Sequence, residues 1–192
     1  MEGSESQPGM IPHSMESLLD LVNRHSASGR GQCQVTMSYL EIYNEQIFDL
    51  LIDARDKLPI REEKPGVYRI SNLSEVHVTT VEEFKKNYSI GVKNRSVAAT
   101  KLNPNSSRSH AVLVVKVSTR DNTPPHHSYT AKLHLIDLAG SEDNRKTDNT
   151  GERLAESSKI NSSLFVLGKV VSALNTKAVR KRPWHSTLHT PY

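Results

Sequence analysis

The chain has 192 residues, of which 35% are hydrophobic and 24% charged, a composition typical of one globular domain. Its single cysteine, Cys33, excludes an internal disulfide and fits a reducing compartment. No apolar run approaches the roughly 20 residues that span a bilayer, and Met1 leads into no signal-like segment, so we expect a soluble intracellular protein.

The formal net charge of +4 is concentrated toward the C-terminus. Residues 143–192 carry nine Lys and Arg against four Asp and Glu, whereas residues 1–142 carry sixteen against seventeen. A basic surface suits an acidic partner, either a tubulin-type filament or a nucleic acid. A solvated face with a basic tail has the same composition, so charge alone does not separate these interpretations.

The N-terminal quarter predicts a loop, a helix and a strand. Residues 1–12 are polar and contain Gly and Pro, which indicates a loop. Ser14 is a candidate N-cap for a helix. After a flexible connection at residues 26–32, residues 35–51 (VTMSYLEIYNEQIFDLL) begin with a β-like pattern. Taken alone, SYLEIYNEQIFDLL within them fits either a helix or a bent pair of strands. The apolar residues that repeat at helical spacing after Ser14 are Met15, Leu18, Leu19 and Val22.

The middle of the chain predicts a hairpin lobe and a second helix. Residues 52–74 are charged and contain Pro and Gly, which favours a small hairpin. Thr80 and Glu83 form a possible capping box for a helix that we expect to break or weaken at Gly91.

A β-branched strand follows at residues 111–119, and a Pro-rich hairpin at residues 121–128 should join it to the next strand. His126 and His127 are adjacent in that hairpin. Neither a cysteine nor a second ligand pair stands at zinc spacing, so we interpret the segment as a surface loop.

The stretch LHLIDLAGSE, residues 133–142, is the segment on which the interpretation of the rest of the sequence depends. Its apolar residues occupy both faces of a strand, so we expect a strand covered on both sides. The strand delivers Asp137 and then Gly140 to its end. Such an acid can hold a hydrated Mg²⁺, and such a glycine lets a backbone N–H approach a γ-phosphate. A plain strand-to-turn junction is compatible with the same residues.

A second stretch, NPNSSRSH at residues 103–110, contains further residues that could contact a metal or a phosphate. Two adjacent hydroxyls and an arginine suit metal and phosphate oxygens, although many Ser-rich segments are only loops. One strand and one hairpin separate this stretch from D-L-A-G-S-E. The pair resembles switch I and switch II of the kinesin motor domain.

The longest periodic segment, residues 154–174, predicts a helix. Gly168 inside it costs about 1 kcal/mol relative to Ala, which suggests close packing there. A coiled coil is the rival interpretation, but about three heptads are short for one. The run ESSKINSSLFVLGKVVSALN instead resembles the kinesin relay helix. The apolar residues that alternate at spacings of four and three are Ile160, Leu164, Leu167, Val171 and Leu174.

The resemblance extends over roughly residues 8–176, and includes SYLEIYNEQIFDLL and NRSVAAT. Residues 141–157 and the spelling SLFVLGKVVSALN most resemble the chromokinesin Kid branch. The resemblance implies an α/β fold, a partial kinesin-type P-loop NTPase motor with a mixed central sheet and helices on both faces. It assigns residues 1–176 to an incomplete motor domain and residues 177–192 to a non-family basic tail.

The resemblance also implies roles for individual residues. In catalysis, Ser106 would help place the attacking water, and Arg108 would pair with Glu142 when the switches close. For the nucleotide and its metal, Ser107 would reach Mg²⁺, Asp137 would bind it through water, and Gly140 would sense the γ-phosphate. The switch and relay positions would be Asn103, His110 and Asn161, and the microtubule contacts would be Lys146 and Lys159.

The implied cofactors are ATP and Mg²⁺, the implied partner is the microtubule, and the implied location is the cytoplasm and cytoskeleton, with spindle or nucleus for a Kid-like protein. Two stretches depart from the family. The chain contains no G-x-x-x-x-G-K-[ST] phosphate loop, and after Asn175 it runs TKAVRKRPWHSTLHTPY where kinesins continue P-Y-R-D-S-K-L-T. We therefore expect open strand edges and poor stability.

Two other functions remain open. One is a non-enzymatic microtubule-binding fragment or truncated isoform. The other is a nucleic-acid module that uses the basic C-terminal quarter, although that quarter lacks interleaved aromatic residues. A GTPase would have comparable switch segments, but the chain carries no N-K-x-D motif, which specifies the base in GTPases.

We predict that the 192-residue polypeptide alone neither binds ATP at micromolar concentration nor releases phosphate in the presence of microtubules. Phosphoryl transfer depends on positioning and charge neutralisation, and the phosphate loop supplies much of both. Adding a kinesin phosphate-loop segment upstream should restore some nucleotide binding. Phosphate release by the chain alone that Glu142→Ala abolishes would contradict the prediction.

Overall fold

The computed structural model describes residues 3, 7, 9–102, 109–140 and 152–180. The chain forms two compact units, residues 1–140 and 141–192. Within the described residues no helix is both long and apolar enough to cross a membrane.

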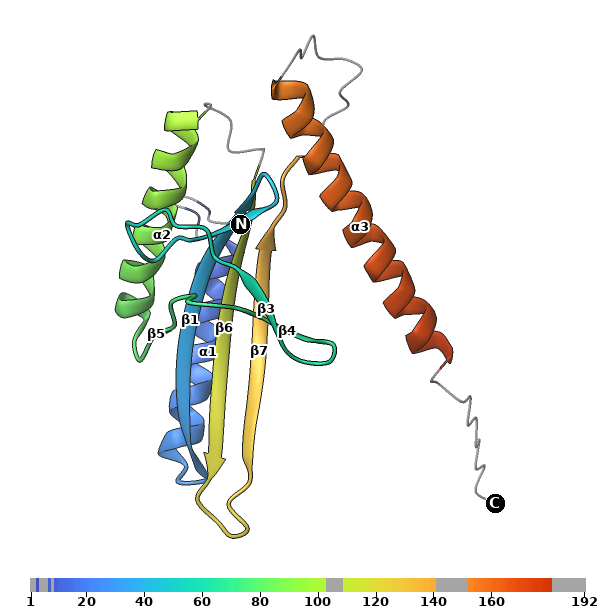
Figure 1. Cartoon of the computed structure of the whole chain (residues 1–192). Helices are drawn as coiled ribbons and strands as arrows, with labels where there is room; N and C mark the ends of the chain where they lie inside the picture. The colour runs from blue at the N-terminus through green and yellow to red at the C-terminus, as the bar shows by residue number, and fades with distance from the viewer. Residues whose placement is uncertain (1–2, 4–6, 8, 103–108, 141–151, 181–192) are drawn as a thin grey trace. The chain divides into compact units, whose positions relative to one another are not determined.

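The first unit is built on an antiparallel sheet whose strands follow the order β2-β1-β6-β7, with β5 paired to β1 (Figure 1). The two long central strands pair from Gly31 and Asp121 to Ile42 and His110. The strands of this sheet are β1 (Gly31–Tyr43), β2 (Gln46–Asp49), β5 (Val76–His77), β6 (His110–Asp121) and β7 (Ser128–Asp137).

The ambiguous segment at residues 38–51 is a pair of strands and not a helix. β1 and β2 form a hairpin whose turn residues Asn44 and Glu45 have φ of 51° and 64°. Two successive left-handed residues are the signature of the tight turns that match the twist of a hairpin. β1 also begins at Gly31, inside the stretch expected to be a flexible connection.

Helix α1 (Met10–Ala27) begins before Ser14, so the expected N-cap and the expected loop at residues 10–12 are wrong. Gly9 occupies the N-cap position, and Ser14 lies inside the helix. The apolar face is nevertheless the expected one. Ile11, Met15 and Leu19 are buried, and they join the core against β1.

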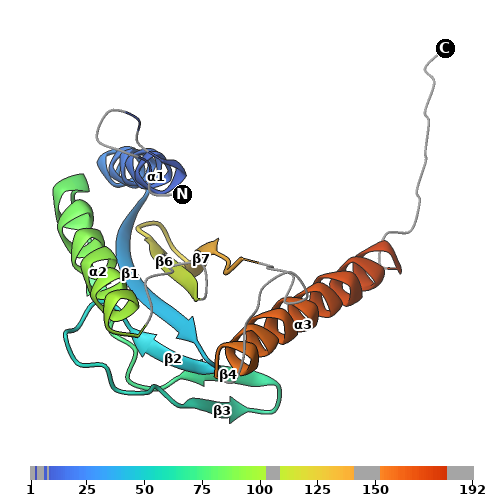
Figure 2. The same ribbon diagram turned by 90° about the horizontal axis from the view of Figure 1, so that it is seen from above.

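Helix α2 (Val81–Leu102) lies on the same side of the sheet as α1 (Figure 2). Glu83 N–H donates to Thr80 Oγ1 at 3.2 Å, and the Glu83 carboxylate accepts from the backbone N–H and the hydroxyl of Thr79. The capping box is therefore present, and the return contact of the Glu83 carboxylate is made with Thr79, one residue before Thr80. These bonds lower the pKa of Glu83, the backbone bond from Thr79 being the largest cause.

The expected break at Gly91 does not occur, because the helix uses this glycine for close approach. A Cβ at Gly91 would lie 2.2 Å from Tyr39 Cδ1 of β1. The ring of Tyr39 stacks on Tyr88 at a centroid distance of 5.4 Å, and Tyr88 stacks on Phe84 at 5.5 Å. The missing side chain thus admits an aromatic row between helix and sheet.

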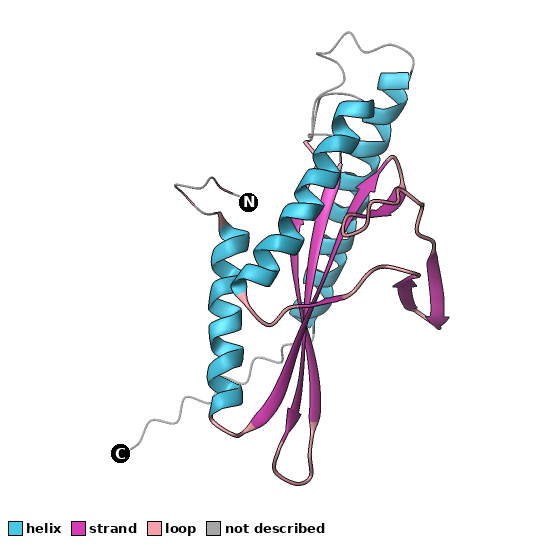
Figure 3. Cartoon of the chain, turned by 90° about the vertical axis from the view of Figure 1, so that its left-hand side faces the viewer, coloured by secondary structure: helices cyan, strands magenta, loops and turns pink. Residues whose placement is uncertain are grey.

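The opposite face of the sheet carries the predicted hairpin lobe. β3 (Ile60–Lys64) and β4 (Val67–Ile70) form a separate two-stranded sheet that lies across the long strands from α1 (Figure 3). Lys116 and Lys132 stand directly opposite each other on this face. Lys116 makes an ion pair with Glu75, and this contact is the main cause of a lowered pKa for Glu75.

β7 is more exposed than its sequence predicts. Leu135 is buried, but Leu133 and Ile136 are 37% and 44% exposed. The expectation of a strand covered on both faces is therefore wrong for the described residues of this unit. The helices pack around β1, and β6 separates that strand from β7.

In the second unit the described residues form one helix, α3 (Glu152–Arg180). This helix confirms the predicted long helix. Lys169 Nζ lies 4.4 Å from the centroid of the Phe165 ring, a cation–π contact. Among the described residues of this unit, nothing lies within 4 Å of a Cβ placed on Gly168, so these residues do not show the expected close packing at this glycine.

We predict that Gly91→Ala lowers the free energy of unfolding by about 1–3 kcal/mol, the usual cost of overpacking. Alanine has the higher helix propensity by about 1 kcal/mol, so a loss of stability would isolate the clash with Tyr39. Urea denaturation measures the effect. Gly168→Ala is the matched control and should be neutral or stabilising. A stabilised Gly91→Ala variant would refute the close approach.

Candidate functional site

Three strands place side chains in one row at one end of the sheet. The pairing register puts Glu41 of β1 opposite Ala111 of β6, and Ala111 opposite Asp137 of β7. All three side chains lie on the face that packs against the helices, since Tyr39 and Leu113 on the same face are core residues. Two carboxylates therefore flank one alanine on a largely apolar face.

Arg95 of α2 supplies the positive charge that this row requires. Its Nη1 donates to Asp137 Oδ2 at 2.7 Å, and its Nη2 donates to the carbonyl oxygen of Ser109 at 3.2 Å. The Arg95 side chain is 11% exposed and that of Asp137 is 47% exposed. One guanidinium thus joins the end of β7 to the residue that precedes β6.

The surroundings keep Arg95 charged. Burial lowers its pKa, but the hydrogen bond to Asp137 and the electrostatic effects of Tyr39, Asp137 and Glu41 outweigh burial, and the pKa is raised. Removing a partner would leave a buried charge uncompensated, which costs several kcal/mol in other proteins. Arg95 is therefore a permanent cation of this site.

His110 connects the two segments a second time. The backbone N–H of Ala139 donates to His110 Nδ1 at 2.9 Å. The acceptor role requires Nδ1 to be unprotonated, so the ring is neutral with its proton on Nε2. Burial is the main cause of the lowered pKa of His110, and the nearby charge of Arg95 lowers it further, against an opposing effect of Asp137.

The site fits a hydrated divalent cation at Asp137. Arg95 occupies one carboxylate oxygen, and no described residue hydrogen-bonds to the other. The half-exposed carboxylate can thus accept hydrogen bonds from a water of a metal's hydration shell. Arg95 Nε is buried and also lacks a partner among the described residues.

Comparison with known proteins places this geometry in a family. Residues 1–192 match the family model for the kinesin motor domain. The chain belongs to the kinesin family. The kinesin-like protein KIF22 of Rattus norvegicus is 52% identical over 176 residues, which make up 91% of this chain and 27% of the relative. The Danio rerio KIF22 is 46% identical over 188 residues, 97% of this chain and 30% of the relative.

Solved kinesin structures share the fold. A fast kinesin has a TM-score of 0.78 at 36% identity, over 93% of this chain and 49% of that one. A KIF14 dimer in complex with AMP-PNP and a microtubule has a TM-score of 0.79 at 33% identity, over 100% and 55%. The chain therefore spans about half of these structures and under a third of the curated relatives. The KIF22 relatives confirm the resemblance to the Kid branch.

The structure brings together only part of the site expected for a kinesin. Asp137 and His110 lie at the same end of the sheet, and Gly140 directly follows Ala139. In the second unit, Asn161 and Lys159 lie on α3. The remaining predicted residues lie outside the described part of the chain: Asn103, Ser106, Ser107, Arg108, Glu142 and Lys146.

Sequence reasoning missed Arg95 and Glu41, although each left a signal. Glu41 has the same strand parity as Val35, Met37 and Tyr39, which form the core face. A carboxylate at a core position predicts a buried cation nearby. Arg95 stands in NRSVAAT, a motif that the resemblance matched without assigning a role.

We predict that stability falls as the pH drops below about 6.5, the ordinary pKa of histidine. The folded state keeps His110 neutral, whereas the unfolded chain takes up a proton below that pH. The contribution is therefore complete at neutral pH and is lost as the pH falls from about 6.5 toward the lower folded pKa.

Urea denaturation between pH 7.5 and 5.5 tests this effect. His110→Asn keeps an acceptor near the position of Nδ1 but does not titrate, so its stability should depend less on pH than that of the wild type. His134→Asn, at an exposed position on β7, is the control and should follow the wild type. Equal slopes for His110→Asn and the wild type would rule out the His110 contribution.

Proposed function

We propose that this kinesin chain carries the switch half of a motor that couples ATP hydrolysis to movement along microtubules. The observation that supports it is the Arg95 guanidinium, which binds both Asp137 and the Ser109 carbonyl. Ser109 immediately follows the S-S-R of the proposed switch I, and Asp137 opens the D-L-A-G-S-E of the proposed switch II. Two segments that resemble nucleotide sensors are thus tied to one helix.

The chemistry of Asp137 agrees with the proposed use of ATP and Mg²⁺. Bound Mg²⁺ neutralises phosphate charge during phosphoryl transfer. Arg95 fixes the rotamer of Asp137 and leaves one carboxylate oxygen for a metal-bound water. His110 holds the backbone of Ala139, just before Gly140, so the start of the proposed switch II has a defined position.

The other proposed site residues extend this arrangement. We assign Ser106, Arg108 and Glu142 to catalysis, Ser107 to Mg²⁺, and Gly140 to the γ-phosphate. Arg108 and Glu142 would act as a pair that forms only on closure, since an exposed ion pair contributes little stability. Asn103 and Asn161 would complete the switch and relay positions.

We further propose that the basic second unit contacts the acidic microtubule surface through Lys146, Lys159 and the outer face of α3. The KIF14 structure, which is in complex with a microtubule, supports this partner. The KIF22 relatives support a cytoskeletal location and, more specifically, a Kid-like place at the spindle or in the nucleus. A microtubule-binding fragment without ATPase activity is the alternative.

We predict weak, salt-sensitive binding of the 192-residue chain to microtubules, because electrostatic attraction between exposed charges is screened within about 8 Å at physiological ionic strength. Cosedimentation at increasing salt measures it. The double reversal Lys146→Glu and Lys159→Glu should weaken binding further.

The matched control reverses Lys86 and Lys93, two exposed lysines of α2, and should bind like the wild type. Tight binding that persists in high salt would contradict the electrostatic contact. Equal loss in both double variants would show that net charge alone, and not the relay helix, determines binding.

A further inference from the structure

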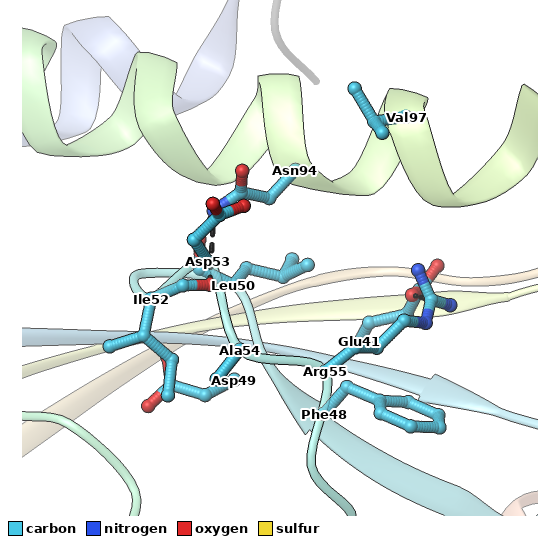
Figure 4. Close-up of a pocket in the computed structure, with 10 residues that line it drawn as sticks. All are labelled: Glu41, Phe48, Asp49, Leu50, Ile52, Asp53, Ala54, Arg55, Asn94 and Val97. Atoms are coloured by element: carbon cyan, nitrogen blue, oxygen red, sulfur yellow. Dashed lines mark hydrogen bonds and ion pairs between the residues drawn. The ribbon is translucent and has the colours of Figure 1, made fainter.

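A small crevice lies between α2 and the segment that follows β2 (Figure 4). Its volume is about 110 Å³. The rim is apolar, with Ile52 and Val97 40% and 44% exposed. The charged groups in its wall are Glu41, Asp49, Asp53 and Arg55, so the lining carries a net negative charge.

The wall of the crevice is held in place by hydrogen bonds. The Asp49 carboxylate accepts from the backbone N–H of Leu51 at 2.8 Å and of Ser74 at 2.7 Å. The side-chain amide of Asn94 donates to the carbonyl oxygens of Leu50 and Ile52, at 2.9 and 3.2 Å. Asp49 and Asn94 therefore build the crevice and are not free to bind a ligand.

Of the two remaining carboxylates in the lining, Asp53 is exposed and Glu41 is buried. The Glu41 side chain is 5% exposed, and its Oε2 accepts a single hydrogen bond from Arg55 Nη2 at 3.1 Å. No described residue hydrogen-bonds to its Oε1. A planar cation that donates to both carboxylate oxygens would therefore add a hydrogen bond that Arg55 does not supply.

Arg55 is the less firmly held partner of this pair. Its side chain is 36% exposed, and its guanidinium lies 4.8 Å above the Phe48 ring. Water already solvates part of this cation, and moving it out of the crevice would complete its solvation while another cation takes its place at Glu41. The apolar ring of Phe48 would remain as a stacking surface.

We propose that the crevice binds a compact planar cation, an amidinium or guanidinium on an apolar group, which replaces Arg55 against Glu41. An apolar cavity of about 150 Å³ holds one benzene molecule. The crevice therefore admits the cationic head, while the apolar group lies on Ile52 and Val97 at the rim. This site does not depend on the proposed motor function.

The experiment uses benzamidine as the probe and ligand-observed NMR titration of the 192-residue chain. A fragment of this size should bind with a Kd on the order of 1 mM. Benzamide has the same shape without the charge and should bind at least about tenfold more weakly, since it loses a charge-assisted hydrogen bond.

Two variants give effects of opposite sign. Glu41→Gln removes the anion and should weaken benzamidine binding by about tenfold or more. Arg55→Gln removes the internal competitor and should strengthen binding several-fold. A purely structural role for the pair would weaken binding in both variants, so strengthening by Arg55→Gln separates the two accounts.

The Arg69–Glu63 ion pair on the hairpin lobe is the matched control. It has the same 3.1 Å separation and is exposed. Glu63→Gln and Arg69→Gln should leave benzamidine affinity unchanged. Loss of binding in Glu63→Gln, unchanged binding in Glu41→Gln, weaker binding in Arg55→Gln, or equal binding of benzamide would each overturn the proposal.

Discussion

The geometry of this kinesin chain depends on one buried cation. Arg95 reaches from α2 to Asp137 on one side and to the Ser109 carbonyl on the other. Glu41 lies in the same row of the sheet and helps to keep Arg95 charged. A buried pair of this kind contributes little net stability compared with apolar packing. The effect of the Arg95 contacts is to fix positions. The start of β6 and the end of β7 must lie where one guanidinium can reach both.

That position requires a fixed placement of α2 along the sheet. Asn94, adjacent to Arg95, ties the helix to the Leu50 and Ile52 carbonyls. One turn earlier, Gly91 lets the backbone approach Tyr39 more closely than any larger residue allows. At the start of the helix, Thr80 and Glu83 close the first turn. Three local features therefore place one arginine, and each acts at a different point along 22 residues of helix.

The sequence predicts which segments form helices and strands better than it predicts how deeply each of them is buried. Alternation and turn residues were sufficient for the β6–β7 hairpin and the β3–β4 lobe, because strand periodicity is a local property. Ser14 failed as an N-cap because Ile11 extends the apolar face by one turn and joins the core. The exposure of β7 could not be predicted from its own residues, since burial depends on which elements pack against it. Resemblance supplied the candidate role of Asp137, while the Arg95 contact required the register of β1, β6 and β7 and the phase of α2.

The row from Glu41 to Asp137 contains two arginine–carboxylate pairs that differ in one physical property. Arg95 is 11% exposed and makes two hydrogen bonds, so its release would leave a desolvated charge and an unpaired carbonyl. Arg55 is 36% exposed and makes one hydrogen bond, so water can replace much of what it loses. The same sheet therefore holds a fixed pair at Asp137 and an exchangeable pair at the crevice. Because Glu41 belongs to the second pair and also contributes to the raised pKa of Arg95, the two pairs are linked electrostatically through Glu41.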